Sequence, residues 1–127
     1  MEKIVEKIRR ELRMGFYSML TLKILIDKGE LHGYGLRNEI RELSDGMFEP
    51  SEGTIYEMLK YLQKKGLIES YWAIGERGKA RKIYRVTEKG VRIYKMICPD
   101  LQAFKKILEY LLAVSYTHLT LPTTERE

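Results

Sequence analysis

The residues with the clearest chemical potential are cations and hydroxyl-bearing side chains gathered between residues 51 and 95. Residues 60–95 hold eleven lysines and arginines against three glutamates, a local net charge of +8, whereas residues 1–59 carry −2 and residues 96–127 carry −1. Cations at this density can neutralise backbone phosphates, and polar side chains among them can hydrogen-bond base edges. A solvated lysine-rich face is the alternative, and a basic run taken alone would favour it.

A helix is predicted over residues 52–65. Some of these cations and hydroxyl-bearing side chains would lie on its exposed face. Ser51 stands at the N-cap position and Gly66 ends the pattern, while Ile55, Leu59 and Leu62 share one apolar stripe. The backbone N–H groups at such an N-terminus attract phosphate, and a polar helix face fits a major groove. The residues expected to contact DNA here are Ser51, Gly53, Thr54, Tyr56, Glu57, Lys60 and Lys64. An ordinary surface helix is the alternative.

A β-hairpin is predicted directly after this helix. Residues 67–74 and 82–87 are rich in β-branched and aromatic side chains, and two glycines between them permit a turn. Cations at its tip would enter a minor groove or clamp phosphates, and those expected to do so are Arg77, Lys79, Arg81 and Lys82. A plain hairpin with solubilising charges is the alternative.

Helical periodicity accounts for the first 44 residues. Residues 2–13 are predicted as a short amphipathic helix, and a second helix begins at Phe16 and is closed by Gly29. Residues 34–44 are predicted as a third helix with three apolar side chains facing inward, namely Leu36, Ile40 and Leu43. The link between the second and third helices contains His32, which is interpreted as a turn or packing residue.

A C-terminal helix is predicted after Thr87, which is a suitable N-cap. Pro99 either kinks this helix or starts a new one. Apolar residues then recur three and four apart, as along a coiled-coil seam, and together with the first helix they exceed what a small monomer leaves exposed. We therefore expect a homodimer, with Ile4, Ile8, Leu12, Ile97, Leu101, Phe104, Leu108 and Leu111 at its interface. Packing between the chain's own first and last helices is a compatible alternative.

Three motifs carry a family resemblance over residues 12–96. Residues 53–56 read Gly-Thr-Ile-Tyr, residues 81–90 read Arg-Lys-Ile-Tyr-Arg-Val-Thr-Glu-Lys-Gly, and residues 33–36 read Gly-Tyr-Gly-Leu. They resemble the third helix, the strand leaving the wing and the entry to the second helix in the PadR family of winged-helix transcriptional regulators.

The resemblance implies a mainly α fold with a small β-hairpin. A winged helix-turn-helix domain would occupy residues 14–87, flanked by dimerisation helices at residues 1–13 and 88–114. It further implies a double-stranded, pseudo-palindromic DNA operator with Tyr34 among the contacts, and repression that ends when an effector changes the spacing of the two recognition helices. A flat hydrophobic effector would lie at the dimer interface, lined by Phe16, Tyr17, Tyr94 and Phe104.

Other kinds of chemistry have little support in the sequence. Cys98 is the one cysteine, and neither a targeting segment nor a membrane span is apparent, so a cytoplasmic protein is expected. His32 and His118 are too few and too scattered to form a metal site with Cys98, and no nucleophile or phosphate loop stands in a recognisable motif. We expect no cofactor and no enzymatic activity. Most aromatic residues, Trp72 included, are expected in the core. A winged-helix module that binds protein or RNA remains the alternative function.

The last stretch departs from the helical pattern. Residues 115–124 read Ser-Tyr-Thr-His-Leu-Thr-Leu-Pro-Thr-Thr and resemble a translated adapter peptide that recurs at the ends of gene predictions from environmental sequencing. The natural sequence is therefore expected to depart from this one near Val114. A flexible tail or a short edge strand over residues 115–127 is the alternative.

Overall fold

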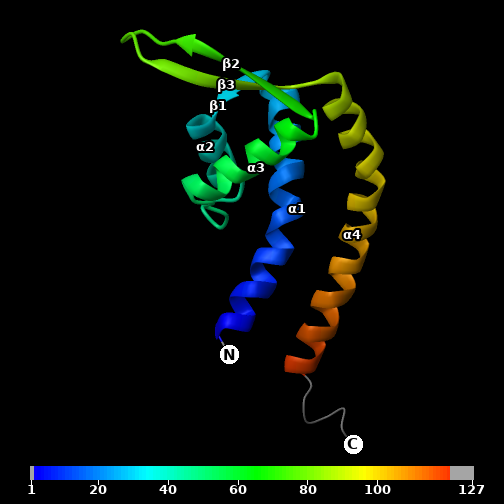
Figure 1. Cartoon of the computed structure of the whole chain (residues 1–127). Coiled ribbons are helices and arrows are strands. Elements are labelled where there is room, and N and C mark those ends of the chain that lie inside the picture. The colour runs from blue at the N-terminus through cyan, green and yellow to red at the C-terminus, as the bar shows by residue number, and fades with distance from the viewer. Residues whose placement is uncertain (1, 121–127) are drawn as a thin grey trace, which may run out of the picture. The chain divides into compact units, whose positions relative to one another are not determined.

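The computed structural model describes the backbone of residues 2–120 and the side chains of residues 2–113. Four helices and three short strands make a mainly helical fold with a small antiparallel sheet, as predicted (Figure 1). In chain order the elements are α1 (Glu2–Lys28), β1 (Glu30–His32), α2 (Gly33–Leu43), α3 (Glu52–Lys64), β2 (Ile68–Ile74), β3 (Ala80–Val86) and α4 (Glu88–Thr120).

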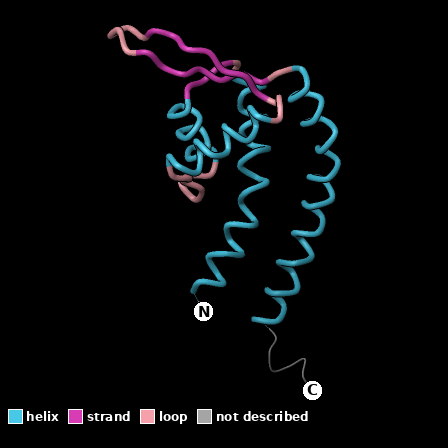
Figure 2. The backbone as a smooth tube through the Cα atoms, in the orientation of Figure 1, coloured by secondary structure: helices cyan, strands magenta, loops and turns pink. Residues whose placement is uncertain are grey.

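The chain forms two compact units, Met1–Tyr94 and Lys95–Glu127. In the first unit, the sheet has the order β1-β3-β2 and lies over the ends of α1, α2 and α3 (Figure 2). Both strand pairs are antiparallel, so that β3 lies between β1 and β2. The second unit is the remainder of α4, from Lys95 onward.

The core of the first unit lies where α1, α2 and α3 meet the sheet. The predicted stripe of α3 is buried, and so are Leu36 and Ile40 of α2. Leu43 was expected to face inward, but 63% of it is exposed. It is the last residue of α2, so its side chain extends past the partners that cover Leu36 and Ile40. The buried core consists of Tyr17, Leu22, Ile24, Leu25, Leu36, Ile40, Ile55, Met58, Leu59, Leu62, Ile68 and Tyr84.

The helices predicted separately at residues 2–13 and from Phe16 are one continuous helix, α1. Gly15 lies inside it and is tolerated, because a glycine weakens a helix without forcing it to end. Gly29 ends α1 as predicted, with a φ of 94° and an N–H that donates to the Leu25 carbonyl at 2.9 Å.

The strand β1 was not predicted, because three residues are too short to show a period. It pairs with β3, with Glu30 opposite Arg85 and His32 opposite Ile83. His32 also caps α2, since its Nδ1 accepts the Gly35 N–H at 2.9 Å. His32, interpreted from the sequence as a turn or packing residue, is thus a strand residue that caps a helix.

The helix α4 continues through Pro99, so of the two alternatives considered for this proline, the start of a new helix is not the one found. The missing N–H of Pro99 removes one hydrogen bond, which a long helix survives. The helix extends to Thr120, so residues 115–120 continue it rather than forming a tail or an edge strand. Residues 121–127 lie outside the described part of the chain. Among the described helices, none combines the length and the apolar character needed to span a bilayer.

Candidate nucleic-acid interface

The N-terminus of α3 is built as the sequence predicts. The Ser51 hydroxyl accepts the Thr54 N–H at 3.1 Å, which satisfies one of the free donors of the first turn. Gly53 is exposed, and a β-carbon built there would meet only the Ser51 hydroxyl, at 3.9 Å. The backbone of this turn is therefore open to close approach. Further along the exposed side of α3 lie Tyr56, Glu57, Lys60 and Lys64, with Thr54 half-buried beside Ser51.

The strands β2 and β3 form a hairpin that extends beyond the helices (Figure 1). Its turn is closed by the Gly75 N–H, which donates to the Lys79 carbonyl at 2.8 Å. Gly78 has a φ of 75°, a conformation that favours glycine. Arg77, Lys79 and Arg81 are exposed along this tip. The hairpin therefore extends the predicted cations away from the helical body.

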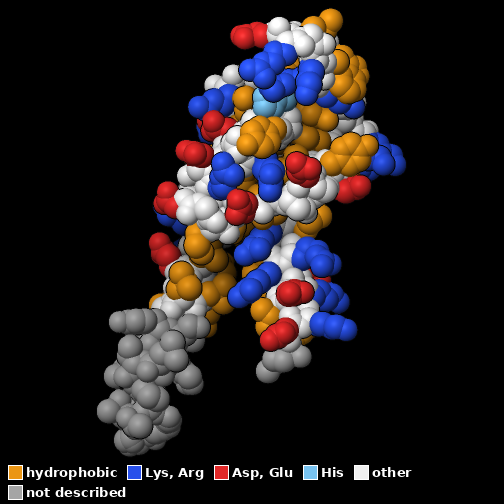
Figure 3. Space-filling view, turned by 90° about the vertical axis from the view of Figure 1, so that its left-hand side faces the viewer, with side chains coloured by type: hydrophobic (Ala, Val, Ile, Leu, Met, Phe, Trp, Pro, Cys, Tyr) orange, Lys and Arg blue, Asp and Glu red, His pale blue; other side chains and the backbone are white. Residues whose placement is uncertain are grey.

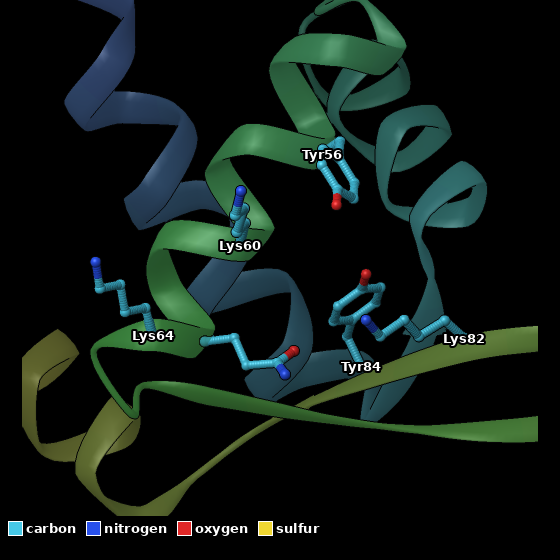
Figure 4. Close-up of a pocket in the computed structure, with 6 residues that line it drawn as sticks. Tyr56, Lys60, Lys64, Lys82 and Tyr84 are labelled. Carbon is cyan, nitrogen blue, oxygen red and sulfur yellow. The ribbon is translucent and has the colours of Figure 1, made fainter.

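A hollow of about 380 Å³ separates α3 from the sheet (Figure 4). The hydroxyl groups of Tyr56 from α3 and Tyr84 from β3 point toward one another across it, and Lys82 lies beside Tyr84. Burial, and then electrostatic interaction with Tyr56, raise the pKa of Tyr84 above its ordinary value. The hollow therefore offers hydroxyl groups and ammonium groups from two elements. Its lining residues are Tyr56, Lys60, Gln63, Lys64, Lys82 and Tyr84.

A second hollow, of about 420 Å³, shares Tyr56, Lys82 and Tyr84 with the first and extends it to the start of α2. Tyr34 lies there, exposed, with its ring stacked on that of His32 at 6.3 Å between centroids. Figure 3 shows the face of the molecule that carries the hairpin tip and α2. On this face basic and apolar side chains lie side by side. The two hollows together make one groove, which we call the α3–wing groove, and it brings together the predicted residues Tyr34, Tyr56, Lys60, Lys64, Arg81 and Lys82.

Two cations of the basic segment, Arg85 and Lys89, already have partners within the protein. The Arg85 guanidinium donates to Glu69 at 2.8 Å and to Glu30 at 3.4 Å, which links all three strands. The hydrogen bond to Glu69, above all, raises the pKa of Arg85. Lys89 donates to the Lys65 carbonyl at 3.0 Å. The positive charge that remains available is therefore concentrated on the hairpin tip and in the α3–wing groove.

Trp72 was expected in the core, and that expectation is wrong, because 67% of the residue is exposed. Strand alternation places it on the same face of β2 as the buried Ile68. The hairpin, however, extends past the helices that cover Ile68. The alternation of side chains along a strand predicts on which face of the sheet a residue lies. It does not predict how far along the strand the helices cover that face.

The residues predicted for a dimer interface are mostly exposed. Those on α1 are Ile4, Ile8 and Leu12, and those on α4 are Phe104, Leu108 and Leu111, while Ile97 and Leu101 are half-buried. Of the residues predicted for an effector pocket, Tyr17 belongs to the core, where its ring meets that of Phe48 edge-on at 6.0 Å. Tyr94 packs against the same core, whereas Phe16 and Phe104 are exposed. Over the described residues, no three His, Cys, Asp or Glu side chains lie close enough to hold a metal ion.

Residues 21–95 match the model of the transcriptional regulator PadR-like family. The chain belongs to this family. Solved structures agree with the match. A transcriptional regulator from Clostridium thermocellum is 30% identical with a TM-score of 0.70, covering 79% of this chain and 93% of its own. A PadR family regulator from Eggerthella lenta is 30% identical with a TM-score of 0.68, and the match covers 87% of this chain and 94% of the Eggerthella lenta chain. PadR of Bacillus subtilis, solved in complex with operator DNA, is 27% identical with a TM-score of 0.55, covering 61% of this chain and 44% of its own. The fold is thus the PadR winged helix, and the chain is a PadR-like transcriptional regulator.

Proposed function

We propose that this PadR-like regulator binds double-stranded DNA in a sequence-specific manner. The observation that carries the proposal is the α3–wing groove, in which three elements of a winged helix bring cations, hydroxyl groups and aromatic rings to one face. The operator complex of the Bacillus subtilis relative supports it. In this arrangement α3 enters a major groove and the hairpin acts as the wing.

The residues divide into two groups by the contacts that they make. Thr54, Tyr56, Glu57 and Lys60 lie on the exposed side of α3 and discriminate between bases. The remaining contacts hold the phosphate backbone and fix the position of α3. They come from the N-terminus of α3, from the start of α2 and from the wing, through Tyr34, Ser51, Gly53, Lys64, Arg77, Lys79, Arg81 and Lys82.

The regulator acts as a homodimer and represses transcription in the cytoplasm. The exposed apolar residues of α1 and α4 support the dimer, because isolated side chains of this kind are common on surfaces but continuous stripes are not. Two-fold symmetry would set the two α3 helices about 34–36 Å apart on a pseudo-palindromic site. A flat hydrophobic effector held between the subunits, near Phe16, Tyr94 and Phe104, would release the operator by changing that spacing.

The test is a salt titration of binding to genomic fragments that the purified protein retains. We expect affinity to fall steeply as the salt concentration rises. The slope of log affinity against log salt concentration should become shallower when Arg77, Lys79 and Arg81 are all replaced by Ala, by about one unit for each phosphate that the variant no longer neutralises. Replacing three exposed cations of α1 by Ala, at Lys3, Lys7 and Arg10, changes the net charge equally and serves as the control. Equal slopes for the two variants would remove the wing from the interface. Retention of single-stranded RNA, or of protein alone, would replace DNA as the partner.

A further inference from the structure

Trp72 is the one tryptophan of the chain, and most of its indole is in contact with water. It lies directly opposite Lys82 in the β2–β3 register, and the Lys82 ammonium is 5.8 Å from the centre of its ring. Ile74, two residues further along the same strand face, is even more exposed. The wing therefore presents an apolar strip where a solvated hairpin would be expected to be polar.

The Trp72 end of this strip lies at the α3–wing groove. Trp72 lines the second hollow together with Tyr34, Tyr56 and Lys82. On the other face of the sheet, the Arg85 guanidinium is paired with Glu30 and Glu69, so its charge is satisfied within the protein. The Trp72 face sets the Lys82 ammonium and exposed apolar surface side by side for a partner.

The charge around Trp72 selects the kind of partner. Arg81, Lys82 and Arg37 line the hollow against a single carboxylate, that of Glu52. An occupant must therefore be anionic and must also offer flat apolar surface to the indole. Double-stranded DNA does both, because its deoxyribose rings and base edges lie between phosphates.

We propose that Trp72 is a DNA-contacting residue of the wing, with its indole against deoxyribose and base edges of a minor groove and Lys82 on an adjacent phosphate. This inference rests on the proposed DNA binding. It adds an apolar contact to the charged, hydroxyl and backbone contacts already proposed for the interface. An apolar contact strengthens binding without releasing counterions, so its removal lowers affinity and leaves the salt slope unchanged.

The experiment follows two signals from the full chain. A fluorescein-labelled duplex of random sequence and about 30 base pairs, long enough for two half-sites, reports binding through its anisotropy. The emission of Trp72 and its quenching by acrylamide report whether the indole is covered. Since Trp72 is the one tryptophan, the second signal comes from a single known position.

We expect saturating duplex to change the Trp72 emission and to protect it from acrylamide. Trp72→Ala should lower affinity about tenfold at every salt concentration, with an unchanged slope, and Trp72→Phe should recover part of the affinity. Tyr61→Ala is the matched control for the emission signal. Tyr61 is similarly exposed and has the Lys65 ammonium 5.8 Å from its ring, but it does not line the groove. That variant should keep the full change in emission.

The two proposals fail in different ways. A rise in anisotropy with unchanged Trp72 emission and quenching, and with wild-type affinity in Trp72→Ala, would overturn the wing contact and leave DNA binding intact. No rise in anisotropy at any salt concentration would overturn both. A circular dichroism spectrum matching that of the wild type would show that the Trp72→Ala protein is folded.

Discussion

Arg85 lies in the basic segment, but its positive charge is neutralised by carboxylates of the protein itself. Its guanidinium is held by Glu69 and Glu30, and it lies over the ring of Tyr71, 5.5 Å from the ring centre. Tyr71 in turn donates its hydroxyl hydrogen to Glu30. The cluster joins β1, β3 and β2 on the face away from the groove, so it fixes the base of the wing while the cations of the groove face a partner.

The hydrogen bond to Glu30, more than desolvation, raises the pKa of Tyr71. The folded protein thus holds this phenol proton more tightly than the unfolded chain, in which the tyrosine pKa is about 10. The resulting stabilisation is complete below that pH and is lost as the pH rises through the folded pKa. Glu30→Ala should bring the Tyr71 pKa down toward the unfolded value, as measured by NMR of labelled tyrosine ring carbons. Glu76→Ala, at the exposed hairpin tip, should leave it unchanged. A Tyr71 titration that is identical in all three proteins would contradict the assignment.

At the scale of elements, the start of α4 is joined to the end of α3. Thr87 donates its hydroxyl hydrogen to the Gly66 carbonyl at 2.7 Å and accepts the Gly90 N–H at 3.0 Å. Its own N–H donates to the Leu67 carbonyl at 3.1 Å. The backbone of α4 can come this close because Gly90 has no β-carbon. Any reorientation of the first turn of α4 would therefore act on the end of α3.

Gly90→Ala should destabilise the fold. The added β-carbon would clash with the Leu67 carbonyl oxygen and would stand 2.7 Å from a Val86 methyl group, so the backbone must shift. Overpacking of this kind costs about 1–3 kcal/mol, to be measured by urea denaturation. Gly15→Ala in α1 is the matched control, because a β-carbon there meets nothing within 4 Å. It should stabilise the protein by about 0.4–1 kcal/mol. Changes of the same sign in the two variants would contradict the close approach.

The elements differ in how well the sequence predicts them, and the reasons are physical. The helix α3 was predicted almost to the residue, because Ser51 and Gly66 mark its ends and its apolar stripe is regular. The strand β1 was missed because its pairing with β3 depends on residues more than 50 positions away. The continuity of α1 was missed because the amphipathic pattern of residues 2–13 and the apolar pattern that begins at Phe16 were interpreted as two separate helices. Local signals fix helix ends, whereas strand pairing and the limits of burial depend on the whole fold.

The candidate site shows the same division. The groove residues Tyr56, Lys60, Lys64, Arg81 and Lys82 were predicted from their order along the chain, since a helix followed by a basic hairpin brings them to one face. Arg37 and Tyr84 also line the groove and were not predicted. Trp72 was misplaced because its exposure depends on how far the helices reach along β2. The pairing of Arg85 with Glu30 could not be predicted from the sequence, because it depends on the register of β1 against β3.

At the scale of the whole molecule, large apolar residues on α1 and, up to residue 113, on α4 are exposed. Phe104, Leu108 and Leu111 are each about half exposed, at 45–55%. They recur three and four apart along a continuous helix, the spacing of a seam between helices. A second copy of the chain is the partner that would cover them at every position at once.

Leu108→Glu should therefore separate the proposed dimer. It would place a carboxylate in the seam, where an unpaired charge is strongly unfavourable, and we expect a monomeric mass by light scattering at micromolar concentration. Duplex affinity should fall by a large factor, because each half-site contact alone is weak. Lys106→Glu is the control, since it changes the charge by more but lies on the opposite side of α4 and should leave the dimer intact. A monomeric mass for the unmodified protein would refute the two-fold arrangement. It would also remove the proposed effector site between subunits, while binding of a single half-site by α3 and the wing would remain.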